Sequence, residues 1–298
     1  MSGAGLKLIS LIPGSGYGDS ACEYAAAIAR QDIAVNWYPT RDDSQNLLPI
    51  RQATADVATP LLEQMAHLWN QPVDAEAFLL DVPPWRWHEY WLQQEPKLRP
   101  YCYLAWEVDR VPVPWIAPLN HFEKVFVPST FNRNTLVDAG VTVPVVTVPH
   151  IARDISLVND GPQVTLEMKD VRADDFVFYT IGAWTSRKNM ESTICSYLEA
   201  FTADDRVVLV IKTEPVNQIE RFRQLNSPGT SHAPHTLGTA WALAGIIARY
   251  PNAARIHLIA ERITPAQIDQ LHRRGDCFVS LTHSEGWGLG AFDAVQHG

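Results

Sequence analysis

The sequence is poor in cysteine, and the cysteines that it has show no pattern. Its four cysteines, among 298 residues, are Cys22, Cys102, Cys195 and Cys277. They are widely scattered and have neither the spacing of a metal-ligand set nor that of a disulfide framework. We therefore expect no metal site and no disulfide network built from them, and a cytoplasmic location fits this usage best.

Long apolar runs and an excess of positive charge are also missing. No stretch approaches the roughly 20 apolar residues that a membrane-spanning helix needs, and the N-terminus has no charged leader before an apolar core. The 24 Lys and Arg are outnumbered by 33 Asp and Glu, which gives a net charge of −9. We expect no integral membrane segment, no nucleic-acid partner and no tight electrostatic docking on anionic lipid.

Regular structure alternates along the first half of the chain. A glycine-rich turn separates the first expected strand from a helix, and Ser129 is placed to cap a later helix. The expected strands are 6–12, 33–37, 77–81, 101–106, 124–127 and 143–148, the helices are about 21–30 and 131–139, and 111–115 is a Pro/Trp loop. This alternation is typical of a parallel α/β domain.

The second half repeats the pattern. Thr264 and Pro265 have the order of a helix cap and a first helical residue. The expected strands are 176–181, 206–212, 255–260 and 276–281, and the helices are 190–201 and 266–273. We predict an α/β fold of two Rossmann-like doubly wound domains that face a cleft, with domains at 1–149 and 150–298, a linker near 149–161 and a mobile loop at 226–239.

The most informative stretch is residues 283–298, HSEGWGLGAFDAVQHG. Its three glycines are interleaved with Trp287 and Leu289 and follow an apolar strand, an arrangement that leaves backbone N–H groups available to an anion. Glu285 lies in the loop, and Asp293 lies in the first turn of a short helix, where each can accept hydrogen bonds from sugar hydroxyls. The alternative is a loop charge and a helix charge favoured by the dipole. We expect a site for a phosphorylated sugar.

A basic pair, Arg187 and Lys188, follows the strand 176–181. Two cations beside a helix N-terminus can neutralise a diphosphate and stabilise it as a leaving group. Taken alone, the pair can equally be a solvated surface feature. Because the carboxyl ends of parallel strands converge on one crevice, the presence of Glu285 after a later strand favours the functional interpretation.

Candidates in the first half are weaker. The loop 14–18 around Gly16 is neither a dinucleotide fingerprint nor a P-loop, although its N–H groups can meet a phosphate. Glu107 and Asp109 follow a strand end and can serve as a base or as acceptor-binding groups, with a local salt link to Arg110 as an equally good explanation.

The histidines give little reason to expect a metal. His121 and His150 fit structural roles better than catalytic ones. His232 and His235 share a Ser/Pro/Gly loop, but no third ligand is in sight.

These residues together resemble glycosyltransferase family 4 (group 1), whose members have the two-domain GT-B fold. The closing stretch resembles the family's two carboxylates separated by seven residues, here Glu285 and Asp293. The turn 182–189 resembles its phosphate-binding turn. The segments 106–109, 127–129 and 148–150, with Trp115, resemble the approach between the domains in many bacterial members. The resemblance covers nearly the whole chain.

The resemblance implies transfer of a sugar from a nucleotide-sugar donor to an acceptor hydroxyl, with retention of configuration and without a metal or other cofactor. Glu285, Lys188 and Arg187 would be catalytic, and Glu107 and Asp109 would lie on the acceptor side. The implied donor-binding residues are Gly16, Trp184, Gly286, Trp287, Gly288, Leu289 and Asp293. The donor would be a UDP- or GDP-sugar, and the acceptor a glycan, glycolipid or other hydroxyl compound.

The sequence departs from the family pattern at three places. The second carboxylate is Asp293 instead of Glu, and the family's earlier arginine near Ala183 or Trp184 is missing, which leaves the diphosphate to Arg187 and Lys188. The family's second domain also continues past the last residue of this sequence, so we expect that domain to be incomplete. Two alternatives remain open, a sugar-nucleotide epimerase of the same architecture and a non-catalytic nucleotide-sugar-binding module.

Overall fold

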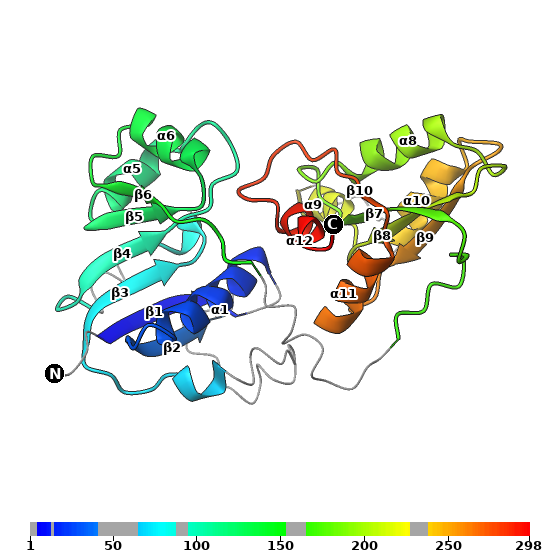
Figure 1. Ribbon diagram of the computed structural model, residues 1–298. Coiled ribbons are helices and arrows are strands. Elements are labelled where there is room, and N and C mark those ends of the chain that lie inside the picture. The colour runs from blue at the N-terminus through cyan, green and yellow to red at the C-terminus, as the bar shows by residue number, and fades with distance from the viewer. Residues whose placement is uncertain (1–4, 13–14, 41–64, 88–94, 153–164, 227–237) are drawn as a thin grey trace. The chain divides into compact units, whose positions relative to one another are not determined.

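The chain divides into two compact units in a computed structural model (Figure 1). The structure describes residues 5–12, 15–40, 65–87, 95–152, 165–226 and 238–298. The first unit is Met1–Gly161 with Glu285–Trp287, and the second is Pro162–Ser284 with Gly288–Gly298. Most of the expected linker and of the expected loop at 226–239 lie outside the described residues, as do His232 and His235.

The first unit is built on a six-stranded sheet, as far as the described residues show, in the order β2-β1-β3-β4-β5-β6. All of its strand pairings are parallel. Its elements are β1 (Gly5–Leu11), α1 (Gly16–Ala29), β2 (Ala34–Thr40), η1 (Ala66–Leu68), β3 (Ala75–Asp81), η2 (Pro84–Arg86), β4 (Arg99–Tyr103), α5 (Val113–Leu119), β5 (Lys124–Val127), α6 (Thr130–Asp138) and β6 (Val145–Thr147).

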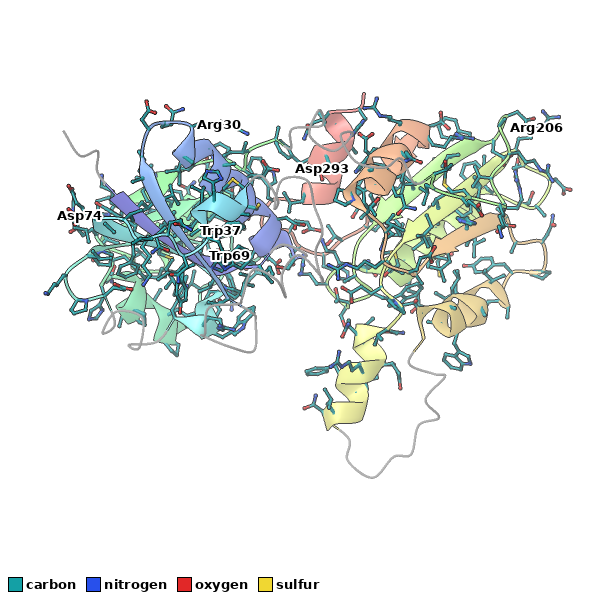
Figure 2. All side chains as sticks on the ribbon, turned by 90° about the horizontal axis from the view of Figure 1, so that it is seen from below. Arg30, Trp37, Trp69, Asp74, Arg206 and Asp293 are labelled. Carbon is teal, nitrogen blue, oxygen red and sulfur yellow. The ribbon has the colours of Figure 1, made fainter. Side chains whose placement is uncertain are left out.

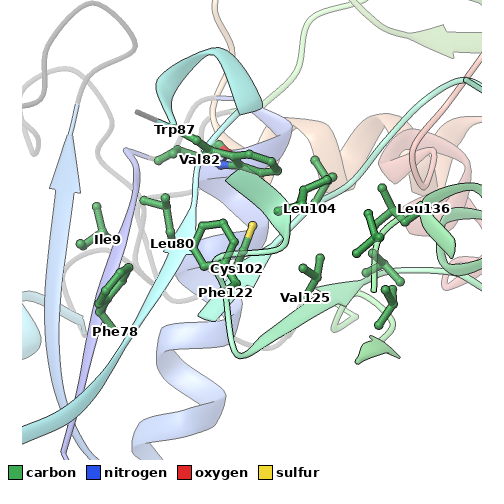
Figure 3. Packing of buried hydrophobic residues seen from close by; sticks show 14 of the residues in the cluster. Ile9, Phe78, Leu80, Val82, Trp87, Cys102, Leu104, Phe122, Val125 and Leu136 are labelled. Carbon is green, nitrogen blue, oxygen red and sulfur yellow. Dashed lines mark hydrogen bonds between the residues drawn. The ribbon is translucent and has the colours of Figure 1, made fainter. Parts of the chain in front are cut away.

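Apolar side chains cover both faces of this sheet, because successive residues of a strand point to opposite faces. Leu8 and Ile9 are neighbours in β1, yet each belongs to a different buried cluster. Figure 3 shows the cluster that contains Ile9, Leu80 and Cys102. The other cluster includes the edge-to-face pair Trp37 and Trp69, whose ring centroids are 5.3 Å apart and which Figure 2 labels.

The second unit is built on a parallel sheet in the order β10-β7-β8-β9, four strands within the described part of the chain. Its elements are β7 (Phe176–Ile181), α8 (Met190–Ala200), β8 (Val207–Lys212), α9 (Gln218–Asn226), α10 (Thr239–Ile247), β9 (Arg255–Ile259), α11 (Pro265–Arg274), β10 (Cys277–Phe278) and α12 (Leu289–Val295). Two parallel sheets with helices between their strands confirm the expected α/β class. No helix in the described ranges is long and apolar enough to cross a bilayer.

The expected helix caps are present. Ser129 accepts a hydrogen bond from the backbone N–H of Asn132 at the start of α6. Thr264 and Gln267 form a capping box at the start of α11, and Pro265 takes the first helical position, where its missing N–H costs nothing. Local sequence signals therefore fix where these helices begin.

Several expected boundaries were wrong. Residues 111–115 were expected to be a loop, but α5 begins at Val113, and a proline in its first turn is compatible with a helix. Helix α1 begins at Gly16 instead of near 21, because Ser15 caps it by accepting from Gly18 N. The helices α9 and α10 were not expected.

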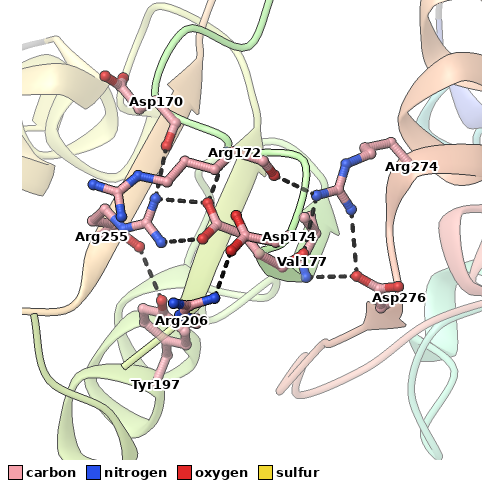
Figure 4. A network of polar contacts seen from close by, with 10 residues as sticks. Asp170, Arg172, Asp174, Val177, Tyr197, Arg206, Arg255, Arg274 and Asp276 are labelled. Carbon is pink, nitrogen blue, oxygen red and sulfur yellow. Dashed lines mark hydrogen bonds and ion pairs between the residues drawn. The ribbon is translucent and has the colours of Figure 1, made fainter. Parts of the chain in front are cut away.

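A cluster of ion pairs lies at the amino end of the second sheet (Figure 4). Asp175 is 4% exposed and accepts hydrogen bonds from both terminal nitrogens of Arg255. The distance between Arg255 Nη1 and Asp175 Oδ2 is 2.6 Å. That hydrogen bonding holds the pKa of Asp175 at about 2. Arg206 and Asp174 form a second pair at 2.7 Å, but both of those side chains are exposed. The buried pair therefore carries most of the electrostatic stabilisation at this edge.

We predict that Asp175→Asn lowers the free energy of unfolding by about 2 kcal/mol at pH 7, because it leaves the Arg255 charge without its carboxylate. The depressed pKa stabilises the fold above the ordinary pKa, and this stabilisation is lost as pH falls from about 4 to about 2. Denaturant unfolding at pH 7 and below pH 4 measures both effects. Asp174→Asn is the matched control and should cost less than about 1 kcal/mol; equal losses in the two variants would contradict the assignment.

Candidate functional site

The strand order of the second sheet marks one place for a ligand. From β7 the chain proceeds through β8 to β9 on one side and then returns to place β10 on the other side. In open parallel sheets, ligands bind outside the carboxyl ends of the strands where the order reverses in this way. The turn after β7 contains Arg187 and Lys188, and residues 281–284 follow β10, so these two segments of the second unit flank the switch point.

The turn after β7 has a defined backbone conformation. Asn189 has a left-handed φ of 48°, and its N–H donates back to Thr185 O and Ser186 O at 3.3 and 3.2 Å. The N–H of Lys188 donates to Thr185 Oγ1 at 3.3 Å. A Cβ on Gly182 would meet the Lys188 side-chain carbons at 3.6–3.8 Å, so the lysine stem lies over that glycine. The turn thus directs Lys188 across the end of β7.

Hydrogen bonds join this turn to the loop after β10. The guanidinium of Arg187 donates to Ser284 O at 2.7 Å, and the backbone O of Arg187 accepts from His283 N at 2.9 Å. The side-chain amide of Asn189 donates to Leu281 O at 3.0 Å. The turn after β7 therefore fixes the loop as far as Ser284, the residue before Glu285.

These bonds also explain why the expected strand 276–281 was wrong. Only Cys277–Phe278 forms β10. Val279 N still donates to Tyr179 O, but Leu281 N donates to the side chain of Thr193 instead of to a strand. The chain leaves the sheet because side chains of the β7–α8 segment replace the ladder partners.

The glycines expected at the end of the loop have two different reasons. Gly288 precedes α12 with a φ of 83°, a conformation that L side chains rarely adopt. A Cβ on Gly290 would lie 3.2 Å from the Phe278 ring and 3.4 Å from Ile181 O. Leu289 is the first residue of α12. Asp293 was expected in the first turn of this helix, but it is the fifth helical residue, beyond that turn, and its side chain is 7% exposed. Glycine thus allows α12 to start directly beside the end of β7.

The remaining predicted donor-side residues lie in different surroundings. Trp184 is 3% exposed and packs in a core cluster of the second unit with Met190 and Ile194. Gly16 is the exposed first residue of α1. Glu285–Trp287 group with the first unit. The indole of Trp184 is therefore a core side chain, and at this residue only the backbone lies at the switch point.

The segment that carries Glu107 and Asp109 is held by side chains of two helices. Tyr17 OH donates to Ala105 O at 2.7 Å. The side chain of Asn132, which is fully buried, accepts from Trp106 N at 3.1 Å and donates to Trp106 O at 2.6 Å. Glu107 is half-buried and Asp109 is exposed. The backbone before these carboxylates is thus fixed although it lies outside any strand.

Asp81 is a candidate that the sequence did not single out. It ends β3 and is paired in register with Ser10 of β1, at the point where the order of the first sheet reverses. Its side chain is fully buried, and neither carboxylate oxygen has a hydrogen-bond partner among the described residues. Burial holds the pKa of Asp81 well above its ordinary value. The sequence signal that could have identified Asp81 is the presence of one carboxylate in the otherwise apolar run 78–82.

His150 belongs to a buried polar chain in the same unit. Its Nδ1 lies 3.2 Å from the hydroxyl of Tyr24, which donates to the hydroxyl of Tyr103 at 2.7 Å. Tyr103 in turn donates to Val148 O at 2.9 Å. Burial lowers the pKa of His150 to about 4, so the ring is neutral at pH 7. The expectation of a structural role for His150 agrees with these contacts.

No group of three His, Cys, Asp or Glu within the described ranges is placed to hold a metal ion. The polar groups at the switch point of the second sheet are the side chains of Lys188 and Arg187 and the backbone amides of the turn after β7. Cationic side chains and backbone N–H groups suit an anionic ligand.

We predict that Asp81→Asn stabilises the first unit at pH 7 by roughly 1 to 3 kcal/mol. The reason is that burial disfavours the ionised form of Asp81, whereas the unfolded chain gains free energy at pH 7 by ionising it. A raised folded-state pKa costs nothing below the ordinary pKa, and the cost grows as pH rises above about 4. The gain should therefore vanish near pH 4 in urea unfolding. Asp74→Asn, at an exposed position just before β3, should change little. A destabilised Asp81→Asn at pH 7 would contradict this account.

We predict the opposite slope from His150. Between pH 6.5 and pH 4 the unfolded chain binds a proton that the folded His150 does not, so stability falls by about 3 kcal/mol as pH decreases through this window. Because Asp81 opposes this slope in the wild type, the loss is best measured in the Asp81→Asn background. Adding His150→Gln should remove it, and an unchanged slope would sink the assignment.

Comparisons with known proteins establish the fold. No family model matches the chain, and no curated protein matches it. The α,α-trehalose-phosphate synthase (UDP-forming) of Burkholderia vietnamiensis has a TM-score of 0.63 and 10% identity over 100% of this chain and 81% of that one. The Burkholderia xenovorans enzyme, in complex with glucose-6-phosphate, has a TM-score of 0.61 and 11% identity over 99% and 83%. An E. coli trehalose-6-phosphate structure bound with UDP-2-fluoro glucose has a TM-score of 0.59 and 11% identity over 99% and 82%. At these identities the likeness shows that the chain has the fold of these proteins.

Proposed function

We propose that this chain is a hexosyltransferase that moves a sugar from a UDP- or GDP-sugar to an acceptor hydroxyl, with retention of configuration and without a metal. The resemblance to glycosyltransferase family 4 remains part of this proposal. The observation that carries it is the hydrogen-bonded union of the basic turn 182–189 with the loop 281–284 at the switch point of the second sheet.

The two cations take different parts. Lys188 lies across Gly182 at the end of β7, where its ammonium group can bind the diphosphate and stabilise it on departure. Arg187 is tied to Ser284 O, so it also positions the loop that leads to Glu285. Positive side chains would thus neutralise the leaving group.

The loop and α12 would hold the sugar and the ribose. Glu285 would contact the donor sugar and Asp293 the ribose hydroxyls. Gly288 has the left-handed φ that starts α12, and Gly290 packs against Phe278 and Ile181, so backbone N–H groups at the start of α12 would bind phosphate oxygens. The other donor-side residues in the proposal are Gly16, Gly286, Trp287 and Leu289, together with Trp184, which would act through its backbone because its indole is buried in the core.

The acceptor side is assigned to Glu107 and Asp109. The Burkholderia xenovorans structure contains glucose-6-phosphate and the E. coli one UDP-2-fluoro glucose. These ligands make a UDP-hexose the first donor to test and a phosphorylated sugar the first acceptor. In the reaction, the bond from the anomeric carbon to the diphosphate oxygen breaks, and the diphosphate leaves with the electron pair. The acceptor oxygen bonds to the anomeric carbon, and its proton passes to the departing diphosphate.

We predict that Lys188→Ala and Glu285→Ala each lower kcat/KM for transfer by about 100-fold or more. Lys188→Ala should also raise the Kd of the nucleoside diphosphate, whereas Glu285→Ala should leave that Kd nearly unchanged, because it removes a contact to the sugar. Thermal shift with a panel of nucleotide-sugars selects the donor, since a bound ligand raises the melting temperature.

Lys169→Ala is the matched control, because Lys169 is exposed and precedes β7 at the amino edge of the same sheet. It should keep full activity, and circular dichroism should show all three variants folded. Full transfer activity in both Lys188→Ala and Glu285→Ala would rule out the proposed function. A released epimer without free nucleotide would indicate the epimerase instead.

A further inference from the structure

Two adjacent polar side chains at the carboxyl end of β8, one half-buried and one buried, have few hydrogen-bond partners within the described residues. Lys212 is half-buried, and the one hydrogen bond of its ammonium group within the described residues goes to Thr213 O at 2.7 Å. Thr213 is 2% exposed, and its hydroxyl has no hydrogen-bond partner in the same part of the chain. Such groups are uncommon in folded proteins, and a ligand bound beside them would satisfy them.

Their position is beside the basic turn. Lys212 pairs in register with Ile181, the last residue of β7, and its carbonyl accepts from Gly182 N at 3.0 Å. Lys188 lies over that same Gly182, and a Cβ on Gly290 would lie 3.4 Å from Ile181 O. The end of β8 is thus adjacent to the residues that surround the end of β7.

The electrostatics of Lys212 favour an incoming anion. Burial lowers the pKa of its ammonium group, and the carboxylates of Glu214 and Glu261 oppose that shift. Within the described ranges, however, no carboxylate lies close enough to form an ion pair with it. Burying a charge without a counter-charge is unfavourable, and a bound phosphate oxygen would supply one.

The basic turn leaves a need for such a cation. The guanidinium of Arg187 donates a hydrogen bond to Ser284 O. The side chain of Lys188 lies over Gly182 at the end of β7. A nucleoside diphosphate carries at least two negative charges.

We propose that Lys212 is a further anion-binding residue of the donor site, where its ammonium group contacts the diphosphate and the Thr213 hydroxyl donates a neighbouring hydrogen bond. This inference rests on the proposed function and deepens it.

The test compares binding of UDP and GDP with binding of uridine and guanosine by calorimetry. Lys212→Met should raise the Kd of the diphosphate that binds by about 10- to 100-fold, the usual size of a charge-assisted hydrogen bond, and leave the Kd of its nucleoside unchanged. Lys212→Arg should stay within about threefold of wild type because it keeps the charge. Thr213→Val should weaken diphosphate binding by less than Lys212→Met does.

Controls separate this inference from the proposed function. Lys169→Met removes an exposed lysine at the opposite edge of the sheet and should not change any Kd. Lys212→Met removes a poorly compensated charge, so its melting temperature without ligand should equal or exceed that of wild type; if it does not fold, Lys212→Gln replaces it. Wild type that binds neither diphosphate, and transfers no sugar, overturns the proposed function and this inference together. Wild type that binds, with Lys212→Met binding equally well or losing the nucleoside to the same extent, overturns the role of Lys212 alone.

Discussion

The organisation of the second unit depends on one set of hydrogen bonds, those between the turn 182–189 and the loop 281–284. Arg187 and Asn189 replace the strand partners that the chain would otherwise find beyond Phe278. Without them the loop would have unsatisfied carbonyls and no fixed path toward Glu285. These hydrogen bonds therefore end β10 at Phe278, fix the path of the loop 281–284 and hold that loop against the turn that contains Arg187 and Lys188.

The two edges of the second sheet differ in how their polar groups are satisfied. At the amino edge, Asp175 is buried against Arg255, and the neighbouring charges are paired as well. At the carboxyl edge, Lys212 and Thr213 are buried with less than their full set of partners. Asp81 is the counterpart at the carboxyl edge of the first sheet. Within the described residues, paired charges thus lie at the amino edge of the second sheet, and polar groups with fewer partners lie at the carboxyl edge, where open parallel sheets bind their ligands.

The sequence predicted the elements best where a local signal sets the boundary. The strands Lys124–Val127 and Phe176–Ile181 begin and end where they were expected, and the caps Ser129 and Thr264 define α6 and α11. It predicted poorly where distant residues decide. Thr193 and Asn189 shorten β10 although they lie 88 and 92 positions away from Leu281 in the chain, and no local sequence pattern indicates this. Likewise, Trp184, which the resemblance gives as a donor-binding residue, packs its indole in a core cluster with Met190 and Ile194 of α8.

Periodicity and punctuation in the sequence by themselves determined the α/β class, the position of the basic turn after β7 and the glycines before α12, because each follows from local backbone geometry. Tertiary structure alone decided which polar groups meet. Strand order put Asp81 at a switch point and Lys212 beside Gly182, and those neighbours are separated by tens of residues in the chain. The physical reason is that the energy of a buried charge depends on its partners in space, and a one-dimensional pattern does not contain them.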